Sequence, residues 1–303
     1  MKSSTKITAR VSLDKVRLNC FCMDGYVHLD PRLADYRRVG WAKPIIKRIK
    51  RHDGTDKHEV CENFKWIFSY FHDKSGNMLR ICTGRRRNAN FIPTLVLIFD
   101  SSYLQPLLYR DVENVLLSFN QIKGISFSVT EVHVAIDLSA RKGTGLYDMI
   151  FNSIRAGKKG KPKYHYRTSV VFGSPKSFTQ LSLYDKAREQ WDRHGIDLRE
   201  DVIRVEPRLK VGRLKDFPRS LKQIGKVNWA FLLPAFFSFH QPTRKLKHIL
   251  NQHELDIPIW ELRDLVMDRF GIRSSNFYRD YVKEVKWLSK LVAGALDKYR
   301  WKP

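Results

Sequence analysis

Five residues in the middle of the chain carry the side chains that metal-assisted phosphoryl transfer requires: His133, Asp137, Tyr184, Lys186 and Glu206. A tyrosine hydroxyl has an ordinary pKa of about 10 and is a weak nucleophile at neutral pH, so it needs a nearby cation or base. Lys186 follows Tyr184 closely and can supply positive charge. The carboxylates of Asp137 and Glu206, with or without His133, can hold Mg²⁺ or Mn²⁺ and so offset charge on a phosphate that is being cleaved.

The positions of these residues follow the two-residue period of β-strands. In the segment VHVAIDL at 132–138, the even-numbered residues are apolar, and His133 and Asp137 lie on the opposite face. In the segment IRVEPRL at 203–209, the isoleucine, valine and leucine form the apolar side, and Glu206 projects from the other. Each segment is therefore predicted to present its carboxylate on the face away from the apolar core.

A third segment, LSLYDK at 181–186, has the same pattern. Its leucines are apolar, and Tyr184 and Lys186 project away from them. If the three strands are neighbours in one sheet, a single polar surface carries the tyrosine, the lysine, the histidine and both carboxylates.

Each of these residues also has a purely structural alternative. Asp137 would cap the end of its strand before Ser139. Glu206 would form ion pairs with Arg204 and Arg208 on a solvated face of the sheet. Tyrosine is common in strands, the sequence Tyr-Asp-Lys is an ordinary way to enter a turn, and a single strand histidine is more often structural than a metal ligand.

The surrounding pattern predicts an α+β fold with a central, mainly antiparallel sheet and flanking helices, followed by a helical C-terminal region. Short apolar or alternating blocks predict strands, and apolar residues at helical spacing predict helices. The expected strands are 11–22, 64–71, 78–82, 95–99, 129–138, 167–172, 179–184 and 202–209. The expected helices of this part are 112–122, 146–154 and 186–194. We expect residues 1–225 to form the α+β core and residues 226–303 to form a helical region that recognises a DNA sequence.

The charge of the chain indicates a polyanionic partner. Lys and Arg number 56 against 31 Asp and Glu in 303 residues, which gives a formal net charge of +25. A hydrophobic content of 43% and an aromatic content of 12% are typical of a folded protein and not of a disordered one. No apolar run approaches the roughly 20 residues that cross a bilayer, and no signal-type segment follows the N-terminus, so we expect no membrane partner and a place in the cytoplasm.

Candidate DNA-binding residues form basic clusters in segments that we expect to be loops. Such clusters suit phosphate contacts, although charged loops are often merely solvated. In the C-terminal part, a helix over 259–271 and a second helix from Ser274 to Leu288 would form a helix-turn-helix, with Arg273, Asn276 and Arg279 near the groove, although most helix pairs of this kind merely pack together. The predicted DNA contacts are Lys47, Arg48, Lys50, Arg51, Arg85, Arg86, Arg87, Lys158, Lys159, Lys161, Arg204, Arg208, Arg273 and Arg279.

The four cysteines allow a zinc site as a less favoured alternative. Cys20, Cys22 and Cys61 with His58 have suitable ligand types, but Cys-x-Cys is a poor zinc motif, and cysteines on strands are usually just buried. With no second pair to match it, the spacing also argues against a disulfide framework.

The order of three segments resembles a known family. The segments are VHVAIDLSA, GSPKSFTQLSLYDKAREQ and VIRVEPRLKVGRLKDF, and together they resemble the core of the rolling-circle replication initiators of filamentous phages and related staphylococcal plasmids. That family has a strand ending in Arg/His-x-Asp-x-x-x-Asp or similar, a strand with a Tyr-Asp-Lys-like element, and a strand with Arg-x-Glu-x-x-x-Lys. The N-terminal SLDKVRLNC resembles its first strand, whose acidic residue corresponds to Asp14. The resemblance covers residues 11–220, most clearly 129–217.

The resemblance implies an enzyme that binds an origin, nicks one DNA strand through a tyrosine and leaves a free 3′-hydroxyl for a host polymerase. It assigns Tyr184 as the nucleophile and Asp137, Glu206 and Asp14 as metal ligands. This chain departs from the family at His133, which stands where an acidic or basic residue is expected, and it lacks the His-hydrophobic-His pair of relaxases. The resemblance also implies duplex and single-stranded DNA, a host helicase and a host polymerase as partners, in a bacterial cytoplasm.

Several alternatives stay open at this point. Tyr166, Tyr278 or Tyr281 would replace Tyr184 if a different tyrosine does the cleavage. A non-enzymatic DNA-binding protein, such as a repressor or a packaging factor, would use the same basic surface without a nucleophile. A ribonucleoprotein is a third alternative, suggested only by charge and aromatic content. The sequence does not determine the oligomeric state.

Overall fold

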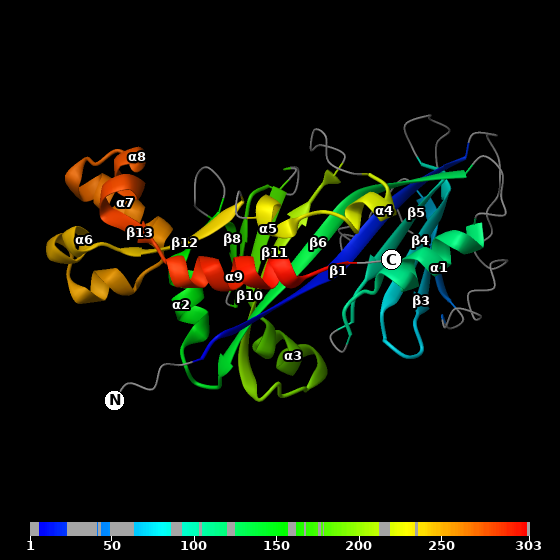
Figure 1. The fold of residues 1–303 in the computed structure, drawn as a ribbon, viewed down its shortest axis with the longest axis horizontal. Coiled ribbons are helices and arrows are strands. Elements are labelled where there is room, and N and C mark those ends of the chain that lie inside the picture. Colours follow the sequence, from blue (N-terminus) through cyan, green and yellow to red (C-terminus); the bar gives the residue numbers. More distant parts are fainter. Residues whose placement is uncertain are drawn as a thin grey trace. The chain divides into compact units, whose positions relative to one another are not determined.

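A computed structural model provides the structure of the chain. It describes residues 6–22, 41, 44–48, 64–85, 93–102, 105–119, 125–156, 162–166, 168–174, 177, 179–211, 219–233 and 236–301. The fold is α+β, as predicted: a large antiparallel sheet is accompanied by helices, and the C-terminal end is helical. Figure 1 shows these elements along the chain.

The larger of the two sheets in the described chain has ten strands, in the order β2-β3-β4-β5-β1-β6-β11-β10-β9-β8. Its strands β1, β6, β11 and β10 are neighbours in that order, so the segments carrying the predicted site residues do lie side by side. The strands are β1 (Thr8–Cys22), β2 (Ile45–Arg48), β3 (Phe64–Phe71), β4 (Met78–Arg85), β5 (Leu95–Asp100), β6 (Ile125–Arg141), β8 (Pro162–Tyr166), β9 (Ser169–Phe172), β10 (Thr179–Asp185) and β11 (Glu200–Leu209).

The long strand β6 is buried on both of its faces. Val132, Val134 and Ile136 form the apolar side that the alternation predicts, and all three are fully buried. His133 on the opposite side is also buried, at 4% exposure. His133 therefore lies in the interior, where a polar group needs a partner because burying it unpaired is costly.

The chain divides into two compact units, each built from separate stretches. Unit 1 comprises Met1–Val11, Ala135–Arg208 and Asn228–Tyr299. Unit 2 comprises Ser12–Val134, Leu209–Val227 and Arg300–Pro303. The boundary near residue 225 was predicted as one between two separately folding parts of the chain, and it stays a prediction.

Unit 2 contains the antiparallel strands β2 to β5 and the helices α1 (Tyr109–Phe119) and α4 (Leu221–Ile224). The register of β1 against β5 pairs Val16 with Phe99 and Leu18 with Leu97, and all four residues are fully buried. These large apolar pairs explain why the segments form adjacent strands, since cross-strand packing stabilises a sheet.

Unit 1 contains β8, β9 and β10, a second sheet of three strands in the order β13-β12-β7, and most of the helices. Helices α2, α7 and α9 all pack against β12. These elements are α2 (Leu146–Ser153), β7 (Ile154–Ala156), α3 (Lys186–His194), α5 (Trp229–Leu232), β12 (Phe237–Pro242), α6 (Arg244–Ile249), η5 (Gln252–Asp256), α7 (Ile259–Phe270), α8 (Ser274–Asn276), η6 (Phe277–Tyr281), β13 (Val282–Glu284) and α9 (Lys286–Lys298).

Two local expectations are wrong. The segment around Lys47 and Arg48 is not a loop but the edge strand β2, which pairs with β3. The helix expected from Ser274 to Leu288 stops early: α8 has three residues, a π-helical turn follows, and β13 then pairs with β12. The main-chain hydrogen bonds of β13 therefore go to a strand, so the predicted helix-turn-helix does not form.

Trp301 ties the end of the described chain into unit 2. Its side chain is buried at 3% exposure, and its indole Nε1 donates to the carbonyl of Leu107 at 3.1 Å. The rings of Trp301 and Tyr109 form a T-shaped pair with their centres 5.1 Å apart. A Cβ added to Gly225 would lie 2.7 Å from the Trp301 carbonyl oxygen, so the fit is close. None of the helices in the described ranges is long and apolar enough to cross a membrane.

We expect Trp301→Ala to lower the free energy of unfolding by about 3–5 kcal/mol, because it removes a large buried side chain and leaves the Leu107 carbonyl without its donor. Denaturant unfolding followed by circular dichroism measures this change. Phe231→Ala is the matched control, because Phe231 is 87% exposed, and its effect should stay within about 0.5 kcal/mol. Equal losses in the two variants would contradict the packing of Trp301.

Candidate functional site

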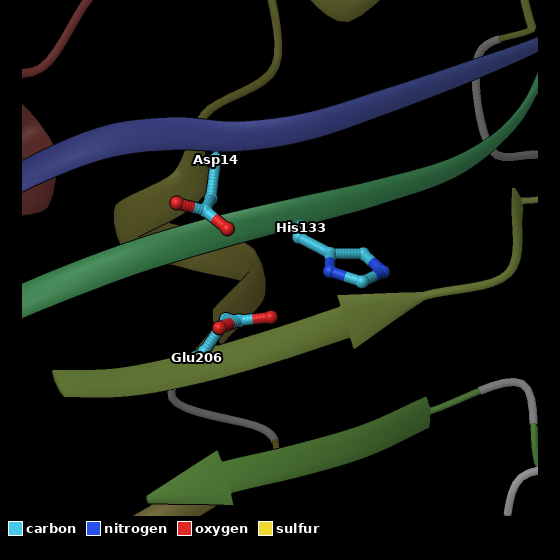
Figure 2. Close-up of side chains that lie close together, drawn as sticks. All are labelled: Asp14, His133 and Glu206. Carbon is cyan, nitrogen blue, oxygen red and sulfur yellow. The ribbon is translucent and has the colours of Figure 1, made fainter. Parts of the chain in front are cut away.

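Three side chains from three neighbouring strands of the sheet form a group that could hold a metal ion. Asp14 lies on β1, His133 on β6 and Glu206 on β11, and one ligand atom from each lies within 4.8 Å of the others. Figure 2 shows the two carboxylates and the imidazole converging. Among the residues that the structure describes, no other such group of His, Cys, Asp or Glu is present. Two carboxylates with one imidazole are a donor set that divalent metal ions accept.

The tyrosine predicted as nucleophile contacts this group directly. The Tyr184 hydroxyl donates a hydrogen bond to Glu206 Oε2 at 3.0 Å. Tyr184 is the last residue but one of β10, and Asp185 then caps α3 by accepting from the Arg188 backbone N–H at 2.9 Å. A strand end and a capped helix start thus fix the backbone on both sides of the tyrosine, which explains why its hydroxyl has a defined position.

The second oxygen of Glu206 has a different partner. Arg208 Nε donates to Glu206 Oε1 at 2.8 Å, and the Glu206 side chain is only 3% exposed. A carboxylate buried this deeply needs compensating charge or hydrogen bonds. Glu206 therefore links a tyrosine, an arginine and the candidate metal ligands within one buried site.

The imidazole of His133 contacts the Glu131 carboxylate through Nε2. His133 Nε2 and Glu131 Oε1 are 2.5 Å apart. Although burial by itself would raise the pKa of Glu131, the hydrogen bond from His133 and the charges of His133, Arg17 and Lys15 lower it to about 2. Glu131 is thus a carboxylate at any physiological pH.

Asp14 is anchored by the end of β5. The Ser101 hydroxyl donates to Asp14 Oδ1 at 2.8 Å, and the Ser101 backbone N–H donates to the Asp14 carbonyl at 2.7 Å. The neighbouring Lys15 pairs with Asp100 at 3.2 Å. These bonds hold β1 in register beside β5, so the Asp14 carboxylate has a fixed place beside His133.

Asp137 lies outside this group. Arg204 binds it with two hydrogen bonds, from Nε to Oδ1 at 2.6 Å and from the second guanidinium nitrogen to Oδ2 at 2.8 Å. Such a paired geometry is the strong form of an arginine–carboxylate interaction. The same bond occupies Arg204, which was predicted to contact DNA.

Lys186 lies close to Tyr184 but has an acidic partner of its own. Its Nζ is 5.7 Å from the centre of the Tyr184 ring and 2.6 Å from Glu189 Oε2. Arg193 also binds Glu189, at 2.9 Å. The positive charge of Lys186 is therefore near the tyrosine ring and partly neutralised by Glu189.

The predicted DNA-binding residues lie on several different elements. Lys47 and Arg48 are exposed on the edge strand β2, Arg85 ends β4, and Arg273 and Arg279 are exposed in unit 1, with Arg279 bound to Asp280 at 2.8 Å. Arg204 and Arg208 bind carboxylates of the sheet interior. Lys50, Arg51, Arg86, Arg87, Lys158, Lys159 and Lys161 lie outside the described residues, as do Cys61 and His58 of the zinc alternative.

The other candidate tyrosines have different surroundings. The hydroxyl of Tyr278 is buried, and Arg155 covers its ring at 3.6 Å. Burial raises its pKa, although Arg263 and Arg155 act in the opposite direction. Tyr281 stacks on Phe277, and the side chain of Tyr166 is outside the described set. Among these, Tyr184 alone has a described bond to the candidate metal group.

Glu131 is the residue of the site that the sequence pattern did not single out. It lies two positions before His133 on β6, and the alternation that groups His133 with Asp137 extends to it. Continuing the polar face of that strand toward its beginning would have revealed it.

Comparisons with known proteins give one point of likeness. No family model matches the chain, and no curated protein matches it. Among solved structures, it is similar to a rolling circle replication initiator protein from Geobacillus stearothermophilus, with 14% identity and a TM-score of 0.42, over 88% of this chain and 98% of that one. That is the class of protein which the sequence resemblance named. A likeness this distant carries no argument about chemistry, so the side chains themselves must supply it.

A matched pair of variants separates the ligands from the ion pair. We expect Asp14→Asn to weaken Mn²⁺ binding by more than about 10-fold, because removing a ligand should cost at least as much as removing a partner of a ligand. Asp137→Asn should leave the affinity within about 3-fold and instead lower the stability by about 1–3 kcal/mol, because Arg204 loses its charged partner. Titration calorimetry and thermal unfolding measure the two effects. A comparable loss of affinity in Asp137→Asn would make Asp137 a ligand.

Proposed function

We propose that this protein cleaves one strand of DNA by a metal-dependent transesterification in which Tyr184 is the nucleophile. The observation that carries the proposal is the 3.0 Å hydrogen bond from the Tyr184 hydroxyl to Glu206, a member of the Asp14, His133 and Glu206 group. A nucleophile that needs activation thus shares a carboxylate with a candidate metal site, which suits phosphoryl transfer to a tyrosine.

The proposed reaction needs no oxidant and no redox cofactor, because one phosphate ester bond is exchanged for another. The Tyr184 oxygen forms a bond to the phosphorus, and the bond from phosphorus to the 3′ oxygen breaks. The tyrosine proton leaves as the bond forms, and the departing 3′ oxygen takes up a proton. The products are a 5′-phosphotyrosine and a free 3′-hydroxyl, and the reverse reaction rejoins the strand.

Each residue of the site has a role that follows from its contacts. Glu206 Oε2 accepts from the Tyr184 hydroxyl and is placed to receive its proton. Arg208 binds the other oxygen of Glu206 and keeps that carboxylate oriented. Lys186 supplies positive charge near the tyrosine ring, a charge that it shares with its partner Glu189.

Asp14, His133 and Glu206 would hold the divalent metal ion, Mg²⁺ or Mn²⁺. When bound, the ion would offset the negative charge that develops on the cleaved phosphate. Of the two, Mn²⁺ suits the site better, because Mg²⁺ prefers oxygen ligands throughout and His133 offers nitrogen.

The proposed substrate is DNA with an origin sequence. The net charge of +25 supports a polyanionic partner, and Lys47 and Arg48 are exposed on β2. A nick that leaves a 3′-hydroxyl primes synthesis by a host polymerase, assisted by a host helicase, so we propose that the chain initiates rolling-circle replication of a phage, plasmid or related element. This step rests on the sequence resemblance and the proposed chemistry together.

We expect Tyr184→Phe to abolish nicking of a supercoiled origin plasmid in Mn²⁺ while leaving DNA affinity within about 2-fold, because only the nucleophilic oxygen is lost. Gel assays of nicking and of the tyrosine-linked product, with fluorescence anisotropy for binding, measure this. Tyr278→Phe is the matched control, since its hydroxyl is buried, and it should nick normally.

Two outcomes would contradict the proposal. Full nicking by the Tyr184→Phe protein would move the nucleophile to another residue. Origin binding by the wild-type protein that needs no metal and never yields a covalent DNA product would favour a non-enzymatic repressor or packaging factor.

The edge strand β2 provides a separate test of DNA contact. Replacing Lys47 and Arg48 together by Gln should reduce the slope of log affinity against log salt concentration by about 1–2, because each lost phosphate contact removes about 0.9 from the slope. Binding titrations between low and moderate salt measure it. The control is the double change of Arg188 and Arg193, two exposed arginines paired with acidic residues on α3. An unchanged slope in the β2 variant would remove this strand from the DNA path.

A further inference from the structure

Glu131 and His133 form a hydrogen-bonded pair beside the candidate metal group. Both lie on the same face of β6, their Nε2 and Oε1 atoms are 2.5 Å apart, and their side chains are 19% and 5% exposed. Arg17 on β1 approaches Glu131 at 3.6 Å from another side. The bond to His133 is the shorter of these two described contacts of Glu131.

The ring nitrogen that faces Glu131 is Nε2, 2.5 Å from Oε1, and it donates to the carboxylate in the tautomer that carries the hydrogen there. The remaining ring nitrogen is Nδ1. Figure 2 shows that one ring nitrogen of His133 faces Asp14 and Glu206 while the other points away from them. The nitrogen on the side of the carboxylates is the one that Glu131 does not bind.

We propose that Glu131 is a positioning residue, which fixes the ring orientation and the tautomer of His133 so that Nδ1 is presented to a metal ion held with Asp14 and Glu206. Histidine ligands commonly donate their other ring N–H to a carboxylate, which orients the ring and makes the ligand nitrogen more basic. The inference rests on the metal site of the proposed function but not on strand cleavage.

A merely structural role for Glu131 has different consequences. The cations Arg17 and Lys15 would satisfy a structural carboxylate, and loss of Glu131 would then affect folding alone. A positioning role instead predicts a change in metal affinity that is separable from stability. It also predicts that a side chain which still accepts a hydrogen bond restores part of the affinity.

The test is Mn²⁺ titration of the full-length protein, by calorimetry or by electron paramagnetic resonance of free Mn²⁺. We expect Glu131→Ala to weaken binding about 10–100-fold. Glu131→Gln should fall between Glu131→Ala and the wild type, because its amide oxygen accepts from Nε2 without the negative charge. Asp73→Asn, at an exposed turn residue of the same unit, is the matched control and should bind Mn²⁺ as the wild type does.

Nuclear magnetic resonance of ¹⁵N-labelled histidine provides a readout that folding alone would not change. In the metal-free wild type, His133 should show a protonated Nε2 at neutral pH, and in Glu131→Gln this preference should weaken. The Gln variant keeps the inference testable if Glu131→Ala does not fold.

The outcomes separate this inference from the proposed function. Mn²⁺ affinity within about 3-fold of the wild type in a folded Glu131→Gln or Glu131→Ala protein, with an unchanged His133 tautomer, would overturn the positioning role even if the wild type nicks DNA. A wild type that fails to nick DNA but loses Mn²⁺ affinity on Glu131 substitution would overturn the proposed function and support the positioning role.

Discussion

The Glu206 carboxylate is the interaction on which the rest of the candidate site depends. It is almost completely buried, and it meets Tyr184 with one oxygen and Arg208 with the other. Burial of an ionised group is tolerated only where partners surround it. Strand β10 brings Tyr184, β11 itself carries Arg208, and β6 and β1 bring His133 and Asp14, so the order of the sheet and the chemistry of the site are one constraint.

This constraint also explains how acidic residues function in so basic a chain. Carboxylates at the exposed surface of a protein with a net charge of +25 would be attracted to many cationic side chains. Asp137 illustrates the result, since Arg204 holds both of its oxygens. Asp14 and Glu206 are instead placed beside an imidazole on adjacent strands, where the group can accept a metal ion.

Much of the fold followed from local pattern. The two-residue alternation correctly placed β1, β3, β6, β10 and β11, because each of these strands buries an apolar face. Asp185 and Gly195 are the N-cap and C-cap residues at the two ends of α3. The pattern failed at β2 and at residues 274–288. The four residues of β2 all have exposed side chains, so they show no alternation of apolar and polar residues. The apolar spacing after Ser274 is typical of a helix, but the backbone of β13 pairs with β12 instead.

The sequence by itself determined the residue types of the site and the faces of the strands that carry them, whereas the neighbourhood of the tyrosine and carboxylate strands came from the order of the sheet. Only the tertiary structure decided which carboxylates meet. Asp137 and His133 share a strand face, yet Arg204 on β11 lies opposite the first and Glu206 near the second. Register between strands distant in sequence sets such pairings, and two residues along β11 separate the ion-pairing Arg204 from the candidate ligand Glu206. Glu131 was visible in the alternation, but its importance required the position of the His133 ring.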